Sequence, residues 1–286
     1  MWENAHNFAD HERTGRRFQP SRRQNRESMS TVIYPSPIFG PVHSRRLGVS
    51  LGINLLPADG KVCTFDCIYC ECGFNADRRP SLPLPTREEV ARALEARLRE
   101  MSQRGPAPDM LTFAGNGEPT AHPHFAEIIA DTLALRDRYF PEAKVSVLSN
   151  ATQALRGEVR DALLLVDNNI QKLDTVSPEY IRRVDRPQGH YDVRRVVESL
   201  RWFRGHVVVQ SIFLGGAYEG FDCDNTGEAY VGPWLDALRE IGPRQVMVYT
   251  IDRETPARGL RKAAPERLDQ IAARVRALGI DCSVSY

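Results

Sequence analysis

Apolar and polar positions change their spacing in a regular way along most of the chain. Short apolar or β-rich runs predict six strands, at residues 49–55, 110–114, 145–149, 170–175, 207–214 and 245–251. Amphipathic stretches predict six helices, at residues 87–102, 125–138, 153–165, 193–204, 231–241 and 265–278. The first helix carries an apolar stripe of Val90, Leu94, Leu98 and Met101. Gly279 follows the last helix, and residues 281–286 are a candidate seventh strand.

The alternation of strands and helices along the chain determines the fold class that we expect. Strands that alternate with helices form a parallel sheet with right-handed crossovers. Six such units predict an α/β protein with an incomplete (βα)6 TIM-like barrel, rather than the full eight-unit barrel. Chemistry in such barrels sits where strands end and loops begin, so residues at those positions are the candidates for a site.

The first 30 residues differ in composition from the rest. The arginines in this segment lie among Asn, Gln, Ser and His, at Arg13, Arg16, Arg17, Arg22, Arg23 and Arg26. Few apolar residues accompany them, which is typical of a disordered segment. We therefore expect a disordered arginine-rich arm at residues 1–30 and one core domain at residues 31–286.

Charge and cysteine content narrow the classes of partner and setting. The chain of 286 residues has 38 basic and 37 acidic side chains, which gives no electrostatic case for a nucleic-acid or membrane partner. No apolar run approaches the roughly 20 residues that span a bilayer, and the polar N-terminus is unlike a secretory signal. Four of the six cysteines crowd into residues 63–72, which favours metal ligation and a reducing, cytoplasmic setting. Cys223 and Cys282 are isolated and are interpreted as ordinary thiols.

The cysteine cluster is the strongest chemical signal. Cys63, Cys67 and Cys70 have the spacing C-x3-C-x2-C, in a loop after the first predicted strand. Soft thiolates favour zinc or iron–sulfur clusters, and three on one loop can hold three corners of a [4Fe–4S] cubane. The fourth iron then stays open for a cofactor or substrate. The alternative is a structural zinc site with Cys72 as the fourth thiolate.

Two further strands end in residues suited to a ligand. The turn Gly115-Asn116-Gly117-Glu118 follows the second predicted strand, where glycines let the backbone approach a ligand and a carboxylate suits an ammonium group. Ser149 and Asn150 end the third predicted strand. Alternatively, Asn150 or Thr152 caps the next predicted helix.

The later strands add charged and polar candidates. Lys172 and Asp174 share one face of the fourth predicted strand by alternation. Charged side chains that face a barrel interior serve a ligand or pair with each other or with an arginine, and we favour a cofactor or substrate contact. Asp252 and Arg253 end the sixth predicted strand and are candidates for substrate binding.

The cysteine motif, with Tyr69 as its aromatic residue, resembles that of the radical S-adenosylmethionine (SAM) superfamily. The resemblance implies the partial barrel of that family and a [4Fe–4S] cluster on Cys63, Cys67 and Cys70. It also implies that SAM chelates the open iron and is cleaved reductively. The resulting 5′-deoxyadenosyl radical then removes a hydrogen atom from a substrate.

The resemblance also implies which residues contact SAM. Residues 115–118 are similar to the family's GGE motif, which binds the SAM amino group, but Asn116 stands between the two glycines. By the same resemblance, the other expected cofactor contacts are Tyr69, Ser149, Asn150, Lys172, Asp174, Gln210 and Ser211.

From Gly40 onward the chain resembles a compact, mostly uncharacterised branch of the superfamily, loosely related to wybutosine-type tRNA-modifying enzymes. The branch markers include the segments at residues 40–48, 172–174, 182–187 and 249–253. Five arginines in these segments are candidates for an anion site: Arg45, Arg46, Arg182, Arg183 and Arg186. Alternatively, they are solvated or paired structural arginines.

The substrate and the electron donor follow less directly. The residues show no added flavin or second-cluster domain, so we expect an external donor of the flavodoxin or ferredoxin type. A small molecule, a peptide and RNA stay open as substrates. The arginine-rich arm motivates RNA, whereas the near-zero net charge weakens it. The alternatives are a radical SAM enzyme that modifies RNA and a non-catalytic zinc or iron–sulfur protein.

Overall fold

A computed structural model describes residues 31–44 and 48–286. Within them, eight strands form one sheet in the order β1-β2-β3-β4-β5-β6-β9-β11. All pairs in this sheet are parallel except β1 with β2. The strands are β1 (Ile38–Ser44), β2 (Gly48–Ile53), β3 (Met110–Phe113), β4 (Lys144–Ser149), β5 (Asn168–Lys172), β6 (Val208–Ile212), β9 (Gln245–Tyr249) and β11 (Asp281–Ser285).

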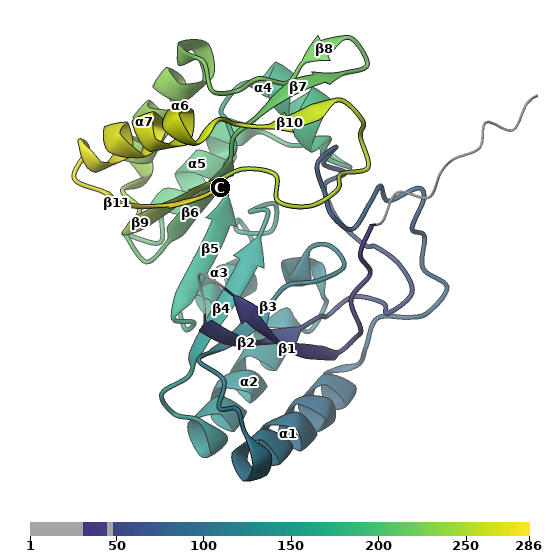
Figure 1. Cartoon of the computed structure of the whole chain (residues 1–286). Coiled ribbons are helices and arrows are strands. Elements are labelled where there is room, and N and C mark those ends of the chain that lie inside the picture. The colour runs from purple at the N-terminus through teal and green to yellow at the C-terminus, as the bar shows by residue number, and fades with distance from the viewer. Residues whose placement is uncertain (1–30, 45–47) are drawn as a thin grey trace, which may run out of the picture.

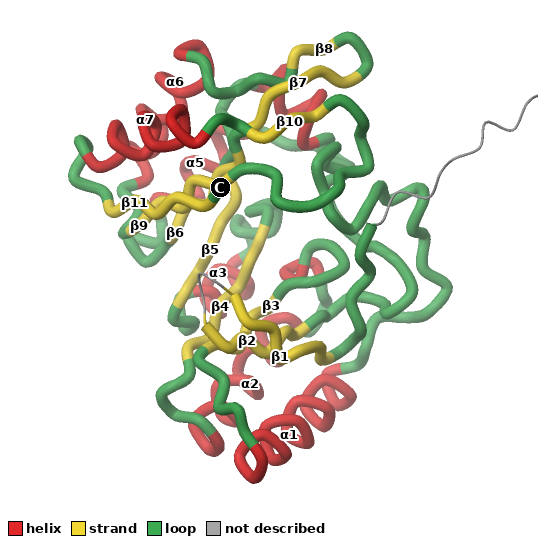
Figure 2. The backbone as a smooth tube through the Cα atoms, in the orientation of Figure 1, coloured by secondary structure: helices red, strands yellow, loops and turns green. Residues whose placement is uncertain are grey.

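Helices follow the parallel strands and cover one side of the curved sheet, whereas long loops gather on the other side (Figures 1 and 2). They are α1 (Arg87–Arg104), α2 (Phe125–Tyr139), α3 (Gly157–Leu163), α4 (Pro178–Tyr180), α5 (Val193–Arg201), α6 (Glu228–Ile241) and α7 (Pro265–Arg276). There is also a short 3-10 helix, η1 (Pro119–Ala121), and a short π-helix, η2 (Ile181–Asp185). The expected α/β fold with a partial barrel is confirmed, and the barrel is not closed. None of the described helices is long and apolar enough to cross a membrane.

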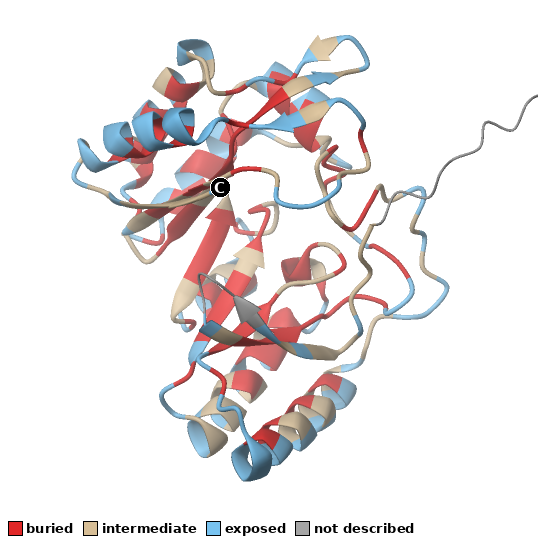
Figure 3. Cartoon of the chain, viewed as in Figure 1, coloured by how far each residue is buried: buried red, intermediate tan, exposed pale blue. Residues whose placement is uncertain are grey.

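Alternation along each strand separates an apolar face from a polar one. Leu51, Ile53, Leu111 and Phe113 point toward the helices and are fully buried in the main core. All four residues of the predicted apolar stripe on α1 are buried against this core, so that prediction is confirmed. Figure 3 shows buried residues concentrated along the strands and on the sheet-facing sides of the helices.

The opposite face of the sheet is more polar. Ser50 of β2 hydrogen-bonds to Thr112 of β3 across 2.8 Å, and both are buried. Lys172 of β5 and Gln210 of β6 are paired positions of neighbouring strands, and both lie on this face. A polar inner face is costly to bury without partners, so it is suited to a ligand at the open side of the sheet.

Several elements differ from their predictions. The predicted strand at residues 207–214 divides, because β6 ends at Ile212 and a new strand, β7 (Leu214–Tyr218), follows. With β8 (Phe221–Asp222) and β10 (Leu260–Lys262), β7 forms a small separate sheet that the sequence pattern did not predict. The predicted helix at 153–165 begins only at Gly157, and β1 was not predicted. The strands of the small sheet have only five, two and three residues, and such short runs are hard to separate from loop sequence.

The small sheet builds a second apolar core beside the loop that follows β2. Ile68 of that loop is fully buried with Tyr180, Val184 and Leu214. The backbone amide of Ala257 also donates to the Ile68 carbonyl at 3.2 Å. The loop with the cysteines is therefore anchored in a core of its own.

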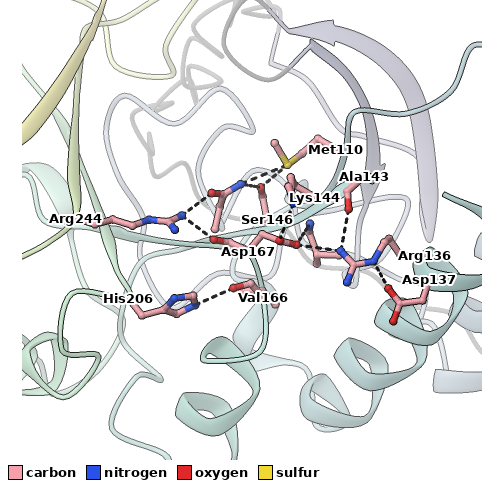
Figure 4. Close-up of polar contacts among 12 residues, drawn as sticks. Met110, Arg136, Asp137, Ala143, Lys144, Ser146, Val166, Asp167, His206 and Arg244 are labelled. Carbon is pink, nitrogen blue, oxygen red and sulfur yellow. Dashed lines mark hydrogen bonds and ion pairs between the residues drawn. The ribbon is translucent and has the colours of Figure 1, made fainter. Parts of the chain in front are cut away.

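A polar network at the amino ends of the strands forms the floor of the barrel (Figure 4). Asp167 accepts hydrogen bonds from Arg136 at 3.1 Å and from the Val145 amide at 2.9 Å, and Lys144 lies 3.6 Å away. Arg244 donates to the Asp167 carbonyl at 2.7 Å. Asp167 therefore joins α2, β4 and the segment before β9.

We predict that Asp167→Ala lowers the free energy of unfolding by about 1–3 kcal/mol, because the buried Val145 amide loses its acceptor. Asp137→Ala is the matched control, since Asp137 contacts the same Arg136 from an exposed position. That change is expected to cost at most about 0.5 kcal/mol. Urea unfolding of both variants measures the difference, and equal losses would contradict the role given to Asp167.

Candidate functional site

The three motif cysteines lie in the loop between β2 and α1. The backbone of this loop pairs with the end of η2: the Asp66 amide donates to the Asp185 carbonyl at 3.1 Å, and the Ile68 amide donates to Val184 at 2.9 Å. The Gln188 amide donates back to Thr64 at 2.8 Å. These bonds fix the path of the cysteine loop against a segment more than 100 residues later in the chain.

The glycine turn holds the other side of the loop. The Val62 amide donates to the Asn116 carbonyl at 2.9 Å, and the Glu118 amide donates to Val62 at 3.2 Å. Gly117 has φ of +135°, and a Cβ there would lie 1.9 Å from the Val62 carbonyl oxygen. Only glycine therefore permits this contact, which places the turn directly beside Cys63.

Glu118 and Asn116 are both buried, and their side chains have protein partners. The Glu118 carboxylate accepts hydrogen bonds from the amides of Asn150 at 2.6 Å and Thr120 at 3.0 Å. Burial raises its pKa above the usual value. The Asn116 amide group donates to the carbonyls of Tyr34 at 2.9 Å and Pro57 at 2.8 Å. Both side chains therefore serve first to hold the shape of this turn.

The end of β4 reaches the cysteine loop as expected for a common site. Asn150 donates to Thr64 Oγ1 at 2.8 Å, and its amide nitrogen lies 3.7 Å from Cys63 Sγ. Ser149 Oγ accepts from the Ala151 amide at 3.1 Å. The alternative of a helix cap fails, because α3 begins at Gly157 with Arg156 at its N-cap position.

A buried charged network lies beside Cys67. Lys172 Nζ is 2.6 Å from Asp174 Oδ2 and 2.7 Å from Asp185 Oδ1. The Tyr69 hydroxyl donates to both carboxylates, and its contact with Asp185 is 3.2 Å. The Lys172 ammonium also lies 5.0 Å from the centre of the Phe65 ring. In this structure Lys172 and Asp174 pair with each other, one of the possibilities that alternation left open.

Burial controls the electrostatics of this network. It raises the pKa of Asp185 to about 7, with Lys172 opposing and Asp174 adding to the shift. Burial lowers the pKa of Lys172, but Asp174 and Asp185 reverse this and hold it well above its usual value. Asp185 was missed from the sequence, although it stands inside the marker segment at residues 182–187. No local pattern distinguishes it from a solvated acidic residue.

The cysteines themselves occupy different environments. Cys63 and Cys70 are partly exposed, whereas Cys67 and Cys72 are buried. Burial raises the pKa of the Cys63 thiol to about 12. A hydrogen bond with the Cys72 thiol lowers the pKa of Cys70 to about 6. The Cys72 thiol also donates to the Gly115 carbonyl at 3.4 Å, which ties the loop to the glycine turn.

Lys61 is a second buried residue that the sequence analysis missed. Its ammonium donates to the Gly73 carbonyl at 2.6 Å and lies 3.8 Å from Asp66 Oδ1. Its side chain is 1% exposed. Burial lowers its pKa, but Cys70, Cys63, Cys67 and Asp66 together hold it above the usual value.

The predicted substrate residues lie at the edge of the site. Arg253 pairs with Glu71 at 2.9 Å and donates to the Tyr34 hydroxyl at 2.8 Å. Tyr34 in turn donates to Glu71 at 2.8 Å, so this trio joins the first described residues to the cysteine loop. Asp252 lies 3.7 Å from Lys262 and is exposed.

Gln210 and Ser211 point to opposite faces of β6. Gln210 hydrogen-bonds to Tyr249 of β9, which lies on the same face as Lys172. Ser211 is fully buried under α6, where it donates to the Leu173 carbonyl at 2.6 Å and accepts from Trp234 at 3.1 Å. Ser211 is therefore separated by the sheet from the cysteine loop.

The cysteine loop carries the donor types of both metal centres that the sequence allowed. In residues 31–44 and 48–286, no group of three or more His, Cys, Asp or Glu side chains could hold one metal ion. Thiolates on one zinc lie about 3.8 Å apart, because each Zn–S bond is about 2.3 Å. In a cubane each thiolate binds a different iron, so the sulfurs are farther apart. The three motif thiols match the donor number of a cubane with one free iron, and together with Cys72 the loop also has the four thiols of a structural zinc site.

Comparison with known proteins decides the family. The family model described as the radical SAM superfamily matches residues 59–222. This match covers more than half of the chain and includes the cysteine loop, the glycine turn and η2. The chain belongs to the radical SAM superfamily. The family resemblance of the cysteine motif is thereby confirmed.

The chain is also similar to individual proteins and to solved structures. A UPF0026 protein of Helicobacter pylori is 30% identical over 226 residues, which cover 77% of this chain and 67% of that protein. A radical SAM methyltransferase from Sphaerobacter thermophilus has a TM-score of 0.60 at 16% identity, over 83% of this chain and 66% of its own.

SuiB of Streptococcus suis, solved with SAM bound, has a TM-score of 0.57 at 14% identity. The match covers 82% of this chain and 50% of SuiB. Likeness at such identities shows that this radical SAM protein shares the fold of these two structures.

We predict that Gly117→Ala separates the glycine turn from the cysteine loop, because its Cβ would overlap the Val62 carbonyl. The expected cost is about 2–3 kcal/mol from the clash and the positive φ. Gly189→Ala is the control, since nothing lies within 4 Å of its added Cβ. Urea unfolding and proteolysis of the loop measure both. Similar stability of the two variants would contradict the close approach.

We predict that Lys172→Met destabilises the metal-free protein by about 3–5 kcal/mol, because Asp174 and Asp185 stay buried without their cation. Asp185→Asn should cost only about 1 kcal/mol, since it leaves one lysine beside one carboxylate. Burial already raises the pKa of Asp185 in the folded state, and without the cation this pKa rises further above the unfolded value. The stability of Lys172→Met is therefore present below about pH 4 and is lost as pH rises through the folded-state pKa of Asp185.

Urea unfolding of both variants between pH 4 and pH 8 measures this difference. Equal losses in the two variants, independent of pH, would show that the network does not depend on the charge of Lys172.

Proposed function

We propose that this protein is a radical SAM enzyme whose Cys63, Cys67 and Cys70 hold a [4Fe–4S] cluster. One observation carries the proposal: the three-thiol loop, the glycine turn and the end of β4 meet at one end of the sheet. Val62 bonds to the turn on one side of Cys63, and Asn150 lies 3.7 Å from its sulfur on the other. The SAM bound to SuiB supports the same cofactor for this chain.

The chain's own residues would have distinct tasks. A reduced cluster, when bound, supplies the electron that cleaves SAM to a 5′-deoxyadenosyl radical. The three thiolates leave one iron free for the cofactor. Gly115 and Gly117 allow backbone polar groups of the turn to meet the SAM amino group, and the Glu118 carboxylate holds this turn against Asn150.

Other residues would position the cofactor. The Tyr69 ring is held by its hydroxyl contacts to Asp174 and Asp185, so its orientation is fixed before SAM binds. Lys172 and Gln210 lie on the inner face of neighbouring strands, where we place further SAM contacts. Preorganisation of this kind reduces the cost of ordering side chains upon binding.

An external donor would supply the electron, in line with the general need of radical SAM enzymes. A flavodoxin or ferredoxin fits this task. The protein would then abstract a hydrogen atom from a substrate that enters at the open side of the barrel. Arg253 and Asp252 lie at that edge and are the substrate contacts that we propose.

We predict that anaerobic reconstitution gives about four irons per chain and, with dithionite and SAM, 5′-deoxyadenosine. Alanine in place of Cys63, Cys67 or Cys70 should abolish the cluster and the product together, because a corner iron loses its thiolate. Cys72→Ala should keep the [4Fe–4S] signal and its change in EPR spectrum on adding SAM. Iron and sulfide analysis, EPR and product chromatography measure these outcomes.

Cys223→Ala is the matched control, since Cys223 is a buried thiol in the second core and not part of the loop motif. One equivalent of zinc without sulfide, lost in Cys72→Ala, would instead support the structural zinc site. Loss of the iron cluster in Cys72→Ala would contradict the assignment of one iron without a cysteine ligand.

A further inference from the structure

Lys61 places a buried positive charge behind the cysteine loop. It stands two residues before Cys63, and its ammonium donates to Gly73, whose own amide closes a turn onto the Cys70 carbonyl at 2.9 Å. Asp66, which lies 3.8 Å from the ammonium, immediately precedes Cys67. The ammonium therefore contacts residues that lie one and three positions from Cys67 and Cys70 in the chain.

The protein neutralises this charge only in part. Among the residues that the structure describes, Asp66 is the one carboxylate that forms an ion pair with Lys61, and the 3.8 Å separation is long for a hydrogen bond. Asp66 is also shared, since it accepts the Asn75 amide at 2.7 Å and lies 3.4 Å from Arg186. A buried ammonium without full compensation is costly, so a further anion nearby would stabilise it.

The proposed cluster is such an anion. A [4Fe–4S] core of charge 2+ with three thiolates has a net charge of −1, and one-electron reduction makes it −2. The ammonium of Lys61 would therefore interact more favourably with the reduced form than with the oxidised form. Nearby charge and burial are among the factors that set the reduction potentials of such clusters.

We propose that Lys61 is the countercharge of the cluster and favours its reduced state, an inference that rests on the proposed function. Lys61 is a positioning residue in this account, because it neither binds iron nor touches the reacting atoms. Its hydrogen bond to Gly73 holds the ammonium at a fixed place below the loop. An external donor would then reduce the cluster at a less negative potential.

The test is an EPR-monitored redox titration of the reconstituted full chain, without SAM, against dithionite in the presence of mediators. Lys61→Met keeps the length of the side chain and removes its charge. At the wild-type midpoint potential, the ratio of reduced to oxidised cluster should fall at least tenfold, which corresponds to about 59 mV for one electron. Lys144→Met is the control, because Lys144 is an exposed lysine at the floor of the barrel.

Asp66→Asn provides a second variant with the opposite sign. It removes the negative charge beside Lys61, so the midpoint potential should rise. If Lys61→Met fails to bind a cluster, Lys61→Gln, which also removes the charge, is titrated in its place and should show the same fall. Unchanged potentials in either loaded variant, or a fall in Asp66→Asn, would overturn the role of Lys61.

Failure of this inference differs from failure of the proposed function. Suppose that wild type and Lys144→Met form a cluster and cleave SAM, but that Lys61→Met has the wild-type midpoint potential. The proposed function then stands, and the role of Lys61 as countercharge is rejected. Wild type that binds no iron overturns both.

Discussion

The backbone pairing of the cysteine loop with two distant segments is the constraint on which the rest of the site depends. The loop has few elements of regular structure, yet it meets η2 through Asp66 and Ile68 and the glycine turn through Val62. Because a buried backbone needs partners for its amides, these bonds also determine where the three thiols can lie. Without them, the spacing of the cysteines in the sequence would not define a shared site.

The second feature of the site is the number of buried charges around the cysteines. Lys172 is balanced by Asp174 and Asp185, whereas the carboxylate that pairs with Lys61, Asp66, lies 3.8 Å away and is shared with Arg186. Charges of this kind are stable only in a pre-formed environment, which preorganises the site but makes it sensitive to the loss of a partner. The two lysines therefore differ: the first belongs to a satisfied network, and the second is open to a further anion.

Sequence patterns predicted the scaffold well where each element has a local period. The three- and four-residue spacing of apolar side chains predicted the stripe of α1, short apolar or β-rich runs predicted the six main strands, and the seventh strand was also found. Prediction was wrong for the start of α3, where residues after Asn150 form a turn, and for the division of β6 from β7. Residues 1–30 and the arginines Arg45 and Arg46 lie outside the described residues, so the arm and part of the anion site stay predictions.

The sequence by itself determined the chemistry of the ligands: the spacing of Cys63, Cys67 and Cys70 and the glycines beside Glu118 are short-range features. Only the tertiary structure decided which distant groups meet them. Asp185 joins Tyr69 from 116 residues away, Lys61 is buried by the turn at Gly73, and Ser211 is directed to the helices. Such contacts leave no periodic signal, because burial and pairing of a single polar residue depend on what the folded chain brings beside it.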